Sequence, residues 1–327
     1  MTSSFRFAAA SALVLLAIPS LAMSAGGALA AETGTTAGPV EHRSFATPDD
    51  AAAALVAALK AGGGAELQAV LGPGAEKLVN SGDPTEDRNN RNRFLTAYAE
   101  KHSLVQETPD QVRFVVGEHD WPLPIPIEKT DGHWQFDATE GAQEIVDRTI
   151  GRNEIAAIRT CLAYVDAQQD YYERSSDLAS GARYAQRLIS SPGRYNGLYW
   201  PAEAGEPESP LGPLVDQARD EGYPGEFISG HPAPYQGYFF RILKQQGPDA
   251  TGGAKDYVGK DGLMSGGFAL VAWPARYGAS GIMSFQVNQD GIVFQKDLGP
   301  STAARVKAMT AFNPDLSWAR VEVEAGK

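Results

Sequence analysis

The sequence is poor in cysteine and in positive charge, and each shortage disfavours a class of protein. Cys161 is the single cysteine among 327 residues, so no intrachain disulfide can form. The 28 lysines and arginines face 40 aspartates and glutamates, and the formal net charge is −12. Binding to nucleic acid or to an anionic membrane surface depends on clustered positive charge. Both kinds of partner are therefore disfavoured, and we expect a neutral or basic ligand, or another envelope protein.

Histidine is also scarce, and the familiar catalytic motifs are missing. The chain has five histidines, and no Cys/His cluster has the spacing of a zinc site. Neither a G-x-S-x-G elbow nor an H-E-x-x-H motif occurs. From the sequence we expect no catalytic residue set, no cofactor and no metal.

The N-terminus has the layout of a secretory signal. Arg6 precedes an apolar run over residues 7–18, and small residues lead to an A-x-A site that places the cut after Ala30. The run is shorter than the ~20 residues that span a bilayer. The sequence thus predicts a signal peptide over residues 1–30 and an exported protein, periplasmic or extracellular, without a membrane span after cleavage. Residues 31–44 are expected to form a linker.

The remaining chain has enough apolar residues for folded cores and enough turn formers for many loops. Hydrophobic residues make up 43% of the sequence, which also contains 35 glycines and 21 prolines. The length is typical of two domains. We expect an α+β fold with a first domain over residues 45–140 and a second over residues 141–327.

The first domain begins with helix signals and continues with strand signals. Thr47-Pro48 and Asp83-Pro84 each provide a capping side chain followed by proline in the first turn, with Glu86 as a capping-box acid in the second case. A short helix is expected over residues 67–71. From residue 103 the apolar positions alternate, and Asp131-Gly132 predicts a hairpin. This order of helices and strands resembles the cone-shaped NTF2-like fold.

The second domain is expected to open with a long helix. Apolar residues on one stripe, Ile155, Ile158, Leu162 and Val165, lie between residues 140 and 172. Cys161 lies beside that stripe, and we expect a small buried hydrophobe there, with a nucleophile as the alternative. A helical piece over residues 184–189, a proline-rich loop region over residues 191–236 and four strands follow. The strands are expected at residues 238–243, 267–273, 281–288 and 292–297.

Two stretches of the second domain are similar to type IV pilin-like proteins. They are the helix segment Arg152-Asn153-Glu154-Ile155-Ala156-Ala157-Ile158-Arg159-Thr160 and the closing stretch Gly266-Gly267-Phe268-Ala269-Leu270-Val271-Ala272-Trp273-Pro274 with Ser284-Phe285-Gln286-Val287-Asn288-Gln289-Asp290-Gly291. The resemblance implies a long helix across an antiparallel meander. Filament assembly is not expected, because a soluble domain precedes the helix instead of an apolar segment.

Two charged clusters are candidate sites, and each has an alternative interpretation. The run over residues 88–93 contains three arginines that could grip an anion; equally, it is typical of a solvated helix face balanced by Glu86 and Asp87. Glu118-His119-Asp120-Trp121 brings together groups for acid–base chemistry at a strand end, or it is a polar turn anchored by an indole.

Aromatic side chains in the proline-rich region are further candidates. Tyr199 and Trp200 could stack on a ligand or a partner, or they could cover a sheet that has few helices. His231 has no serine or cysteine partner in a recognisable motif. The weak binding candidates are therefore His119, Asp120, Trp121, Tyr199, Trp200 and His231.

The chain as a whole resembles DUF2950, a family of uncharacterised exported bacterial proteins. The resemblance rests on motifs that occur in order along the sequence. They include Phe45-Ala46-Thr47-Pro48, Ser81-Gly82-Asp83-Pro84, Asp120-Trp121-Pro122-Leu123-Pro124-Ile125-Pro126, Gly197-Leu198-Tyr199-Trp200-Pro201 and Gly237-Tyr238-Phe239-Phe240-Arg241. The family implies export but no particular activity.

These observations favour a non-enzymatic interaction or scaffold module of the cell envelope. The alternative is a periplasmic enzyme or small-ligand binder that uses a cleft between the two domains, with His119, Asp120 and His231 as its polar groups. The sequence leaves the ligand, the partner and the oligomeric state open.

Overall fold

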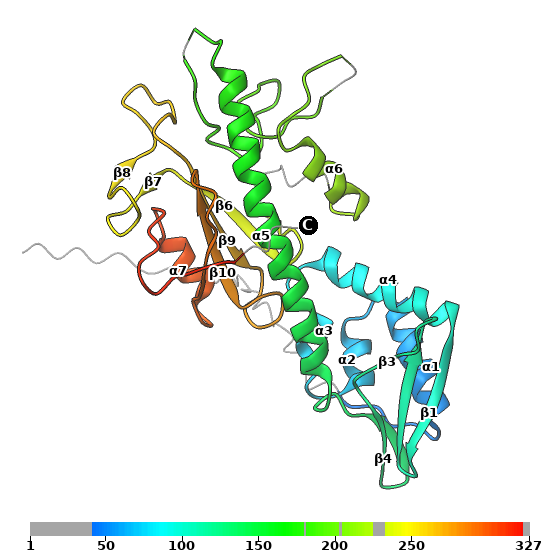
Figure 1. The fold of residues 1–327 in the computed structure, drawn as a ribbon. Helices are drawn as coiled ribbons and strands as arrows, with labels where there is room; N and C mark the ends of the chain where they lie inside the picture. The colour runs from blue at the N-terminus through cyan, green and yellow to red at the C-terminus, as the bar shows by residue number, and fades with distance from the viewer. Residues whose placement is uncertain (1–40, 180, 203–204, 225–232, 323–327) are drawn as a thin grey trace, which may run out of the picture. The chain divides into compact units, whose positions relative to one another are not determined.

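The computed structural model describes residues 41–179, 181–202, 205–224 and 233–322 (Figure 1). The expected signal peptide, most of the expected linker and His231 lie outside these residues. Over the described part the fold is α+β, as expected, and the strands within its sheets pair antiparallel. No helix in this part of the chain has the length and apolarity that crossing a membrane requires.

The helices of the first half begin where the capping signals predict. α1 (Pro48–Lys60) starts after Thr47, whose hydroxyl accepts a hydrogen bond from the backbone N–H of Asp50 at 3.1 Å. α2 (Ala65–Leu71) follows three glycines with positive φ. α4 (Pro84–Glu100) starts after Asp83, and a short α3 (Glu76–Val79) that the sequence did not predict lies before it.

The capping-box role expected for Glu86 is wrong. The backbone N–H of Asp83 donates to the Ser81 hydroxyl at 3.3 Å, so the N-cap donor already has a partner. The Glu86 carboxylate accepts from two arginines, Arg93 and Arg152, instead. A long-range ion pair therefore replaces the local hydrogen bond.

The first sheet has the strand order β1-β2-β4-β5, and β3 also pairs with β2. Its strands are β1 (His102–Thr108), β2 (Gln111–Val116), β3 (Trp121–Pro122), β4 (Ile127–Thr130) and β5 (His133–Phe136). The predicted hairpin joins β4 to β5, with φ of +53° at Asp131 and +82° at Gly132. β3 is short because proline lacks the N–H that a ladder needs.

α5 (Ala142–Ser175) confirms the long helix, and three residues of the predicted stripe, Ile158, Leu162 and Val165, pack against the core beneath it. Ile155 is 53% exposed, whereas Ala157, Cys161 and Tyr164 are buried. Small residues allow the helix backbone to approach the sheet closely, and Tyr164 fills the space beside them. The buried face is thus rotated away from Ile155.

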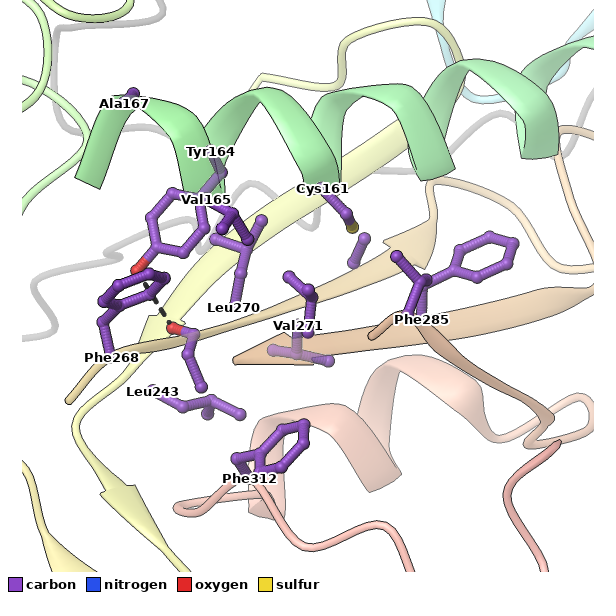
Figure 2. Close-up of a cluster of buried hydrophobic side chains, with 14 of the residues drawn as sticks. Cys161, Tyr164, Val165, Ala167, Leu243, Phe268, Leu270, Val271, Phe285 and Phe312 are labelled. Atoms are coloured by element: carbon purple, nitrogen blue, oxygen red, sulfur yellow. Dashed lines mark hydrogen bonds between the residues drawn. The ribbon is translucent and has the colours of Figure 1, made fainter. Parts of the chain in front are cut away.

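The second sheet has the order β12-β11-β10-β9-β6. Its strands are β6 (Tyr238–Leu243), β9 (Ala269–Pro274), β10 (Met283–Asn288), β11 (Phe294–Asp297) and β12 (Ala319–Arg320), with β7 (Gln245–Gln246) and β8 (Lys255–Asp256) paired separately. α5 packs on one face, and α7 (Thr302–Ala308) lies on the other (Figures 1 and 2). The four predicted strands are confirmed, whereas α7 was not foreseen.

The core between α5 and the second sheet is closely packed. Figure 2 shows Cys161 and Tyr164 of α5 pointing down onto Leu270, Val271 and their neighbours. The Tyr164 hydroxyl donates to a backbone carbonyl of β9 at 3.2 Å. Cys161 is fully buried, and burial raises the pKa of its thiol to about 12, so the expected role of a small hydrophobe is confirmed.

Two details of the proline-rich region differ from expectation. Residues 184–189 form no helix, because their backbone groups bond to distant partners: the N–H of Tyr184 donates to the carbonyl of Met264 at 2.8 Å. A helix that the sequence did not predict, α6 (Gly212–Asp220), lies within the expected loop. Its first turn contains Pro213, which is tolerated there.

Candidate functional site

A cavity of about 440 Å³ lies between α1, α2, α4, the segment after β3 and the first turns of α5, and Ala279 of the second half also lines it. Cavities of roughly 300–1,000 Å³ are typical of small-molecule sites. The inner wall is apolar and comprises Leu67, Leu71, Phe94, Leu123 and Ile125, among others. These side chains extend the first hydrophobic core, so the cavity is a gap in that core.

Positive charge surrounds this apolar wall. Five cationic side chains line the cavity against a single carboxylate, that of Asp87. The cations are Lys77, Arg91, Arg93, Arg148 and Arg152. The chain as a whole carries a net charge of −12, so this excess of positive charge at the cavity is opposite in sign to the charge of the whole protein. The cavity therefore combines an apolar interior with a field that attracts anions.

Two of the arginines at this rim are held by a buried acid. The carboxylate of Glu86 is 6% exposed and lies 2.6 Å from a guanidinium nitrogen of Arg152 and 3.2 Å from one of Arg93. The side-chain oxygen of Asn90 accepts from both arginines. Glu86 thus offsets one of their two positive charges, and α4 and α5 together fix the geometry of the cluster.

Arg91 differs from this pair. It is half-buried in the cavity lining and forms no ion pair or hydrogen bond within the part of the chain that the structure describes. Asp87, one helical turn earlier, attracts it only electrostatically. Arg148 pairs with exposed Glu144, and its guanidinium carbon lies 6.0 Å from the centre of the Trp121 ring. Lys77 also lacks an ion pair within the described residues but is exposed, so Arg91 is the half-buried rim cation that is available to a ligand.

Asp87 is a partly buried carboxylate beside Arg91. Burial raises the pKa of its carboxyl group above the ordinary value, although hydrogen bonds from Ser81 and the charge of Arg91 act in the opposite direction. The backbone N–H of Ser81 donates to both carboxylate oxygens at 3.3 Å. The environment beside Arg91 therefore penalises charge, which strengthens any electrostatic interaction made there.

Asp83 joins the start of α4 to Tyr223 and Gly237. One carboxylate oxygen accepts from the backbone N–H groups of Thr85 and Glu86, both at 3.1 Å. The other accepts from the hydroxyl of Tyr223 and the N–H of Gly237, both at 2.9 Å. Burial raises the pKa of Asp83, while these donors favour its charged form. Asp83 is 1% exposed, and its four hydrogen bonds indicate a structural role, in which it connects α4 with Tyr223 and Gly237.

Of the acid–base candidates in the turn after β2, only the indole lines the cavity. Trp121 is half-buried in the cavity wall. Asp120 is exposed, has a φ of +50° and pairs with Lys101 at 2.7 Å. His119 is exposed, and neither it nor Asp120 belongs to the described cavity lining.

The aromatic candidates are built into the second core. Trp200 is 6% exposed, and its indole N–H donates to the carbonyl of Pro207 at 2.9 Å. Tyr199 is buried, and its hydroxyl accepts from Arg219 at 2.6 Å. The structure thus separates these two residues from Trp121, and His231 lies outside the described residues.

The contribution of α5 to the cavity was missed in the sequence analysis. Arg148 and Arg152 are about 60 residues from the arginines of α4 along the chain, and their convergence depends on the tertiary fold. Their four-residue spacing puts them on one face of a helix, together with Ile145, and this was the available signal. Within the described part of the chain, no group of three or more His, Cys, Asp or Glu side chains is arranged to hold a metal ion.

A second cavity, of about 160 Å³, lies between α5, α6 and β6. Leu188, Leu214, Val215 and Phe240 are among its lining residues, and no charged side chain is among those described. Its volume falls below the usual range for small-molecule sites. We interpret it as a packing gap beneath α6.

One comparison with known proteins gives a match. A model of the family described as "Protein of unknown function (DUF2950)" matches residues 42–321. No curated protein matches the chain, and no solved structure does.

Proposed function

The chain belongs to the DUF2950 family, and we propose that it is an exported, non-enzymatic binding module that holds a small ligand in the cavity of its first half. The observation that carries this proposal is the cavity itself. Its volume of about 440 Å³ is typical of ligand sites, and its apolar wall and charged rim provide the two kinds of contact that such sites combine.

The arrangement of the polar groups favours binding over acid–base catalysis. Glu86 is paired with two arginines, Asp83 accepts four hydrogen bonds, and Asp120 pairs with Lys101 outside the cavity. General acid–base chemistry needs a titratable group that can reach the substrate. Of the sequence candidates, Trp121 and the arginines Arg91 and Arg93 of the 88–93 run are among the lining residues that such a ligand would touch.

The proposal includes the domain organisation and the location. Two separate hydrophobic cores, one within residues 45–142 and one within residues 157–318, support an N-terminal domain over residues 45–140 and a second over residues 141–327. The helix and strand order of each half is the basis for NTF2-like and pilin-like subfolds. The tripartite pattern over residues 1–30 supports export to the periplasm or the exterior.

A thermal-shift screen of small molecules tests the binding function. A true ligand raises the unfolding temperature of the wild type, because it binds the folded state only. The variant Thr149→Trp fills the cavity from α5, where Thr149 is half-buried in the lining. Gln169→Trp, at an exposed position of the same helix, is the control.

The expected result is that ligands shift the wild type and Gln169→Trp but not Thr149→Trp. If every stabilising compound shifts all three proteins equally, the cavity is not a binding site. If no compound from a chemically broad set shifts the wild type, the binding function is wrong.

A further inference from the structure

The inner wall of the cavity selects for an apolar group. Leu67, Leu71, Leu123 and Ile125 are each less than 10% exposed and present only hydrocarbon to the cavity. A water molecule needs two to four polar partners to be stable in a cavity, and this wall offers none. Hydrocarbon placed there would instead remove apolar surface from water.

The rim selects for a negative charge. Arg93 and Arg152 share the single carboxylate of Glu86, and no carboxylate in the described residues forms an ion pair with Arg91 or Lys77. A guanidinium group offers donors in a planar fork that matches carboxylate and phosphate oxygens. Arg91 lies beside a region dry enough to raise the pKa of Asp87, so an anion bound there would be poorly screened.

We propose that this cavity binds a single-chain amphiphile with an anionic head group, its chain among Leu67, Phe94 and Ile125 and its head on Arg91. The inference rests on the proposed binding function and names its ligand class. The ligand is taken up as a monomer, because a net charge of −12 opposes docking of the whole protein on an anionic membrane. Carboxylate and phosphate head groups share the required chemistry.

Isothermal titration calorimetry with probes of one chain length tests the inference. The anionic probes are dodecanoate and dodecyl phosphate, the neutral probe is dodecyl maltoside, and the cationic probe is dodecyltrimethylammonium, all below their micelle concentrations. Both anionic probes are expected to bind tightest, because only their head groups complement the rim. Flotation with phosphatidylglycerol vesicles tests whether the protein binds an anionic membrane instead, and no association is expected.

Three variants assign the parts of the site. Arg91→Gln should weaken dodecanoate binding by about tenfold, the effect of losing one charge-assisted hydrogen bond. It should leave binding of the neutral probe unchanged. Arg159→Gln removes the same charge from an exposed position outside the cavity and should bind dodecanoate as the wild type does. Thr149→Trp should abolish binding of both probes.

The outcomes separate this inference from the proposed function. Equal affinities for all head groups, with no effect of Arg91→Gln but loss of binding in Thr149→Trp, would overturn the anionic ligand class and leave the binding function standing. Vesicle association without monomer binding would overturn the monomeric ligand. Absence of binding by all four probes, or unchanged binding in Thr149→Trp, would overturn the assignment of the amphiphile to this cavity.

Discussion

The core beneath α5 and the rim of the cavity differ in how their polar side chains are paired. In the second half, the amide of Gln168 donates to the Tyr164 hydroxyl and to the carbonyl of Ala185 and accepts from the N–H of Ala185, at 2.8–2.9 Å. Glu154 likewise accepts from two backbone N–H groups of the 282–283 segment. In the first half, Arg91 lines a cavity without an ion pair or hydrogen bond from the described residues.

This difference distinguishes polar side chains that stabilise the fold from polar side chains that are available to a ligand. A buried polar group with all its partners fixes the fold, and its loss lowers the free energy of unfolding. A polar group without partners beside an apolar cavity contributes little to folding and is available to a ligand. Variants of side chains with all their partners should therefore change stability, and variants of cavity side chains without partners should change binding.

The largest effect is expected at Asp83. Asp83→Ala leaves four donors without their acceptor, including the Tyr223 hydroxyl and the N–H of Gly237, and should lower the free energy of unfolding by about 3–4 kcal/mol. Thr47→Ala removes the corresponding exposed cap of α1 and should cost about 1 kcal/mol. Urea unfolding of both variants measures the difference, and equal losses would show that Asp83 is only a helix cap.

The next effect is expected in the second core. Gln168→Leu keeps the volume but leaves the N–H and the carbonyl of Ala185 buried without partners, so the free energy of unfolding should fall by about 2–3 kcal/mol. Gln169→Leu makes the same change at an exposed neighbour and should stay within about 0.5 kcal/mol of the wild type. A wild-type midpoint for Gln168→Leu in urea would contradict the structural role of this amide.

A smaller effect is expected from the titration of Asp87. Because burial raises its folded-state pKa above the unfolded value, its favourable contribution is complete below the unfolded pKa of about 3.9 and is lost as pH rises through the folded pKa. Asp87→Asn removes this titration. The stability of the wild type relative to Asp87→Asn should therefore fall as the pH rises from about 4, measured by urea unfolding across pH 3.5–7. A difference that grows with pH would contradict the sign.

The smallest effect on stability is expected at the cavity rim. Arg91→Gln removes no ion pair or hydrogen bond within the described residues, so its free energy of unfolding should lie within about 0.5 kcal/mol of the wild type. Arg152→Gln loses the pair with buried Glu86 and should be less stable than Arg91→Gln. Urea unfolding of the two variants compares them. The reverse order would show that Arg91 serves the fold.

Local sequence signals predicted most of the fold. The capping pairs at Thr47 and Asp83 predicted the starts of α1 and α4, and the strand expected at residues 238–243 has the bounds of β6. Predictions failed where distant partners decide. Residues 184–189 form backbone hydrogen bonds with Met264 and other remote groups instead of a helix. The Glu86 side chain pairs with Arg152 instead of capping α4.

The candidate site was less predictable, for an electrostatic reason. The net charge of −12 predicted neutral or basic partners. A net charge does not say where the individual charges lie in the fold. The rim of the cavity reverses that sign locally by bringing arginines of α4 and α5 together. Trp121 was identified from its motif. Arg91 lacks an ion pair because of the acids that the fold places around it, and the sequence alone does not predict that arrangement.

A crystal structure with 12-bromododecanoate tests the central claim most directly, because bromine is located by its anomalous scattering. The account predicts one bromine position inside the cavity, among Leu67, Phe94 and Ile125, and the carboxylate within hydrogen-bond distance of Arg91. Bromine in the smaller cavity beneath α6, or an empty first cavity in a protein saturated with the probe, would contradict it.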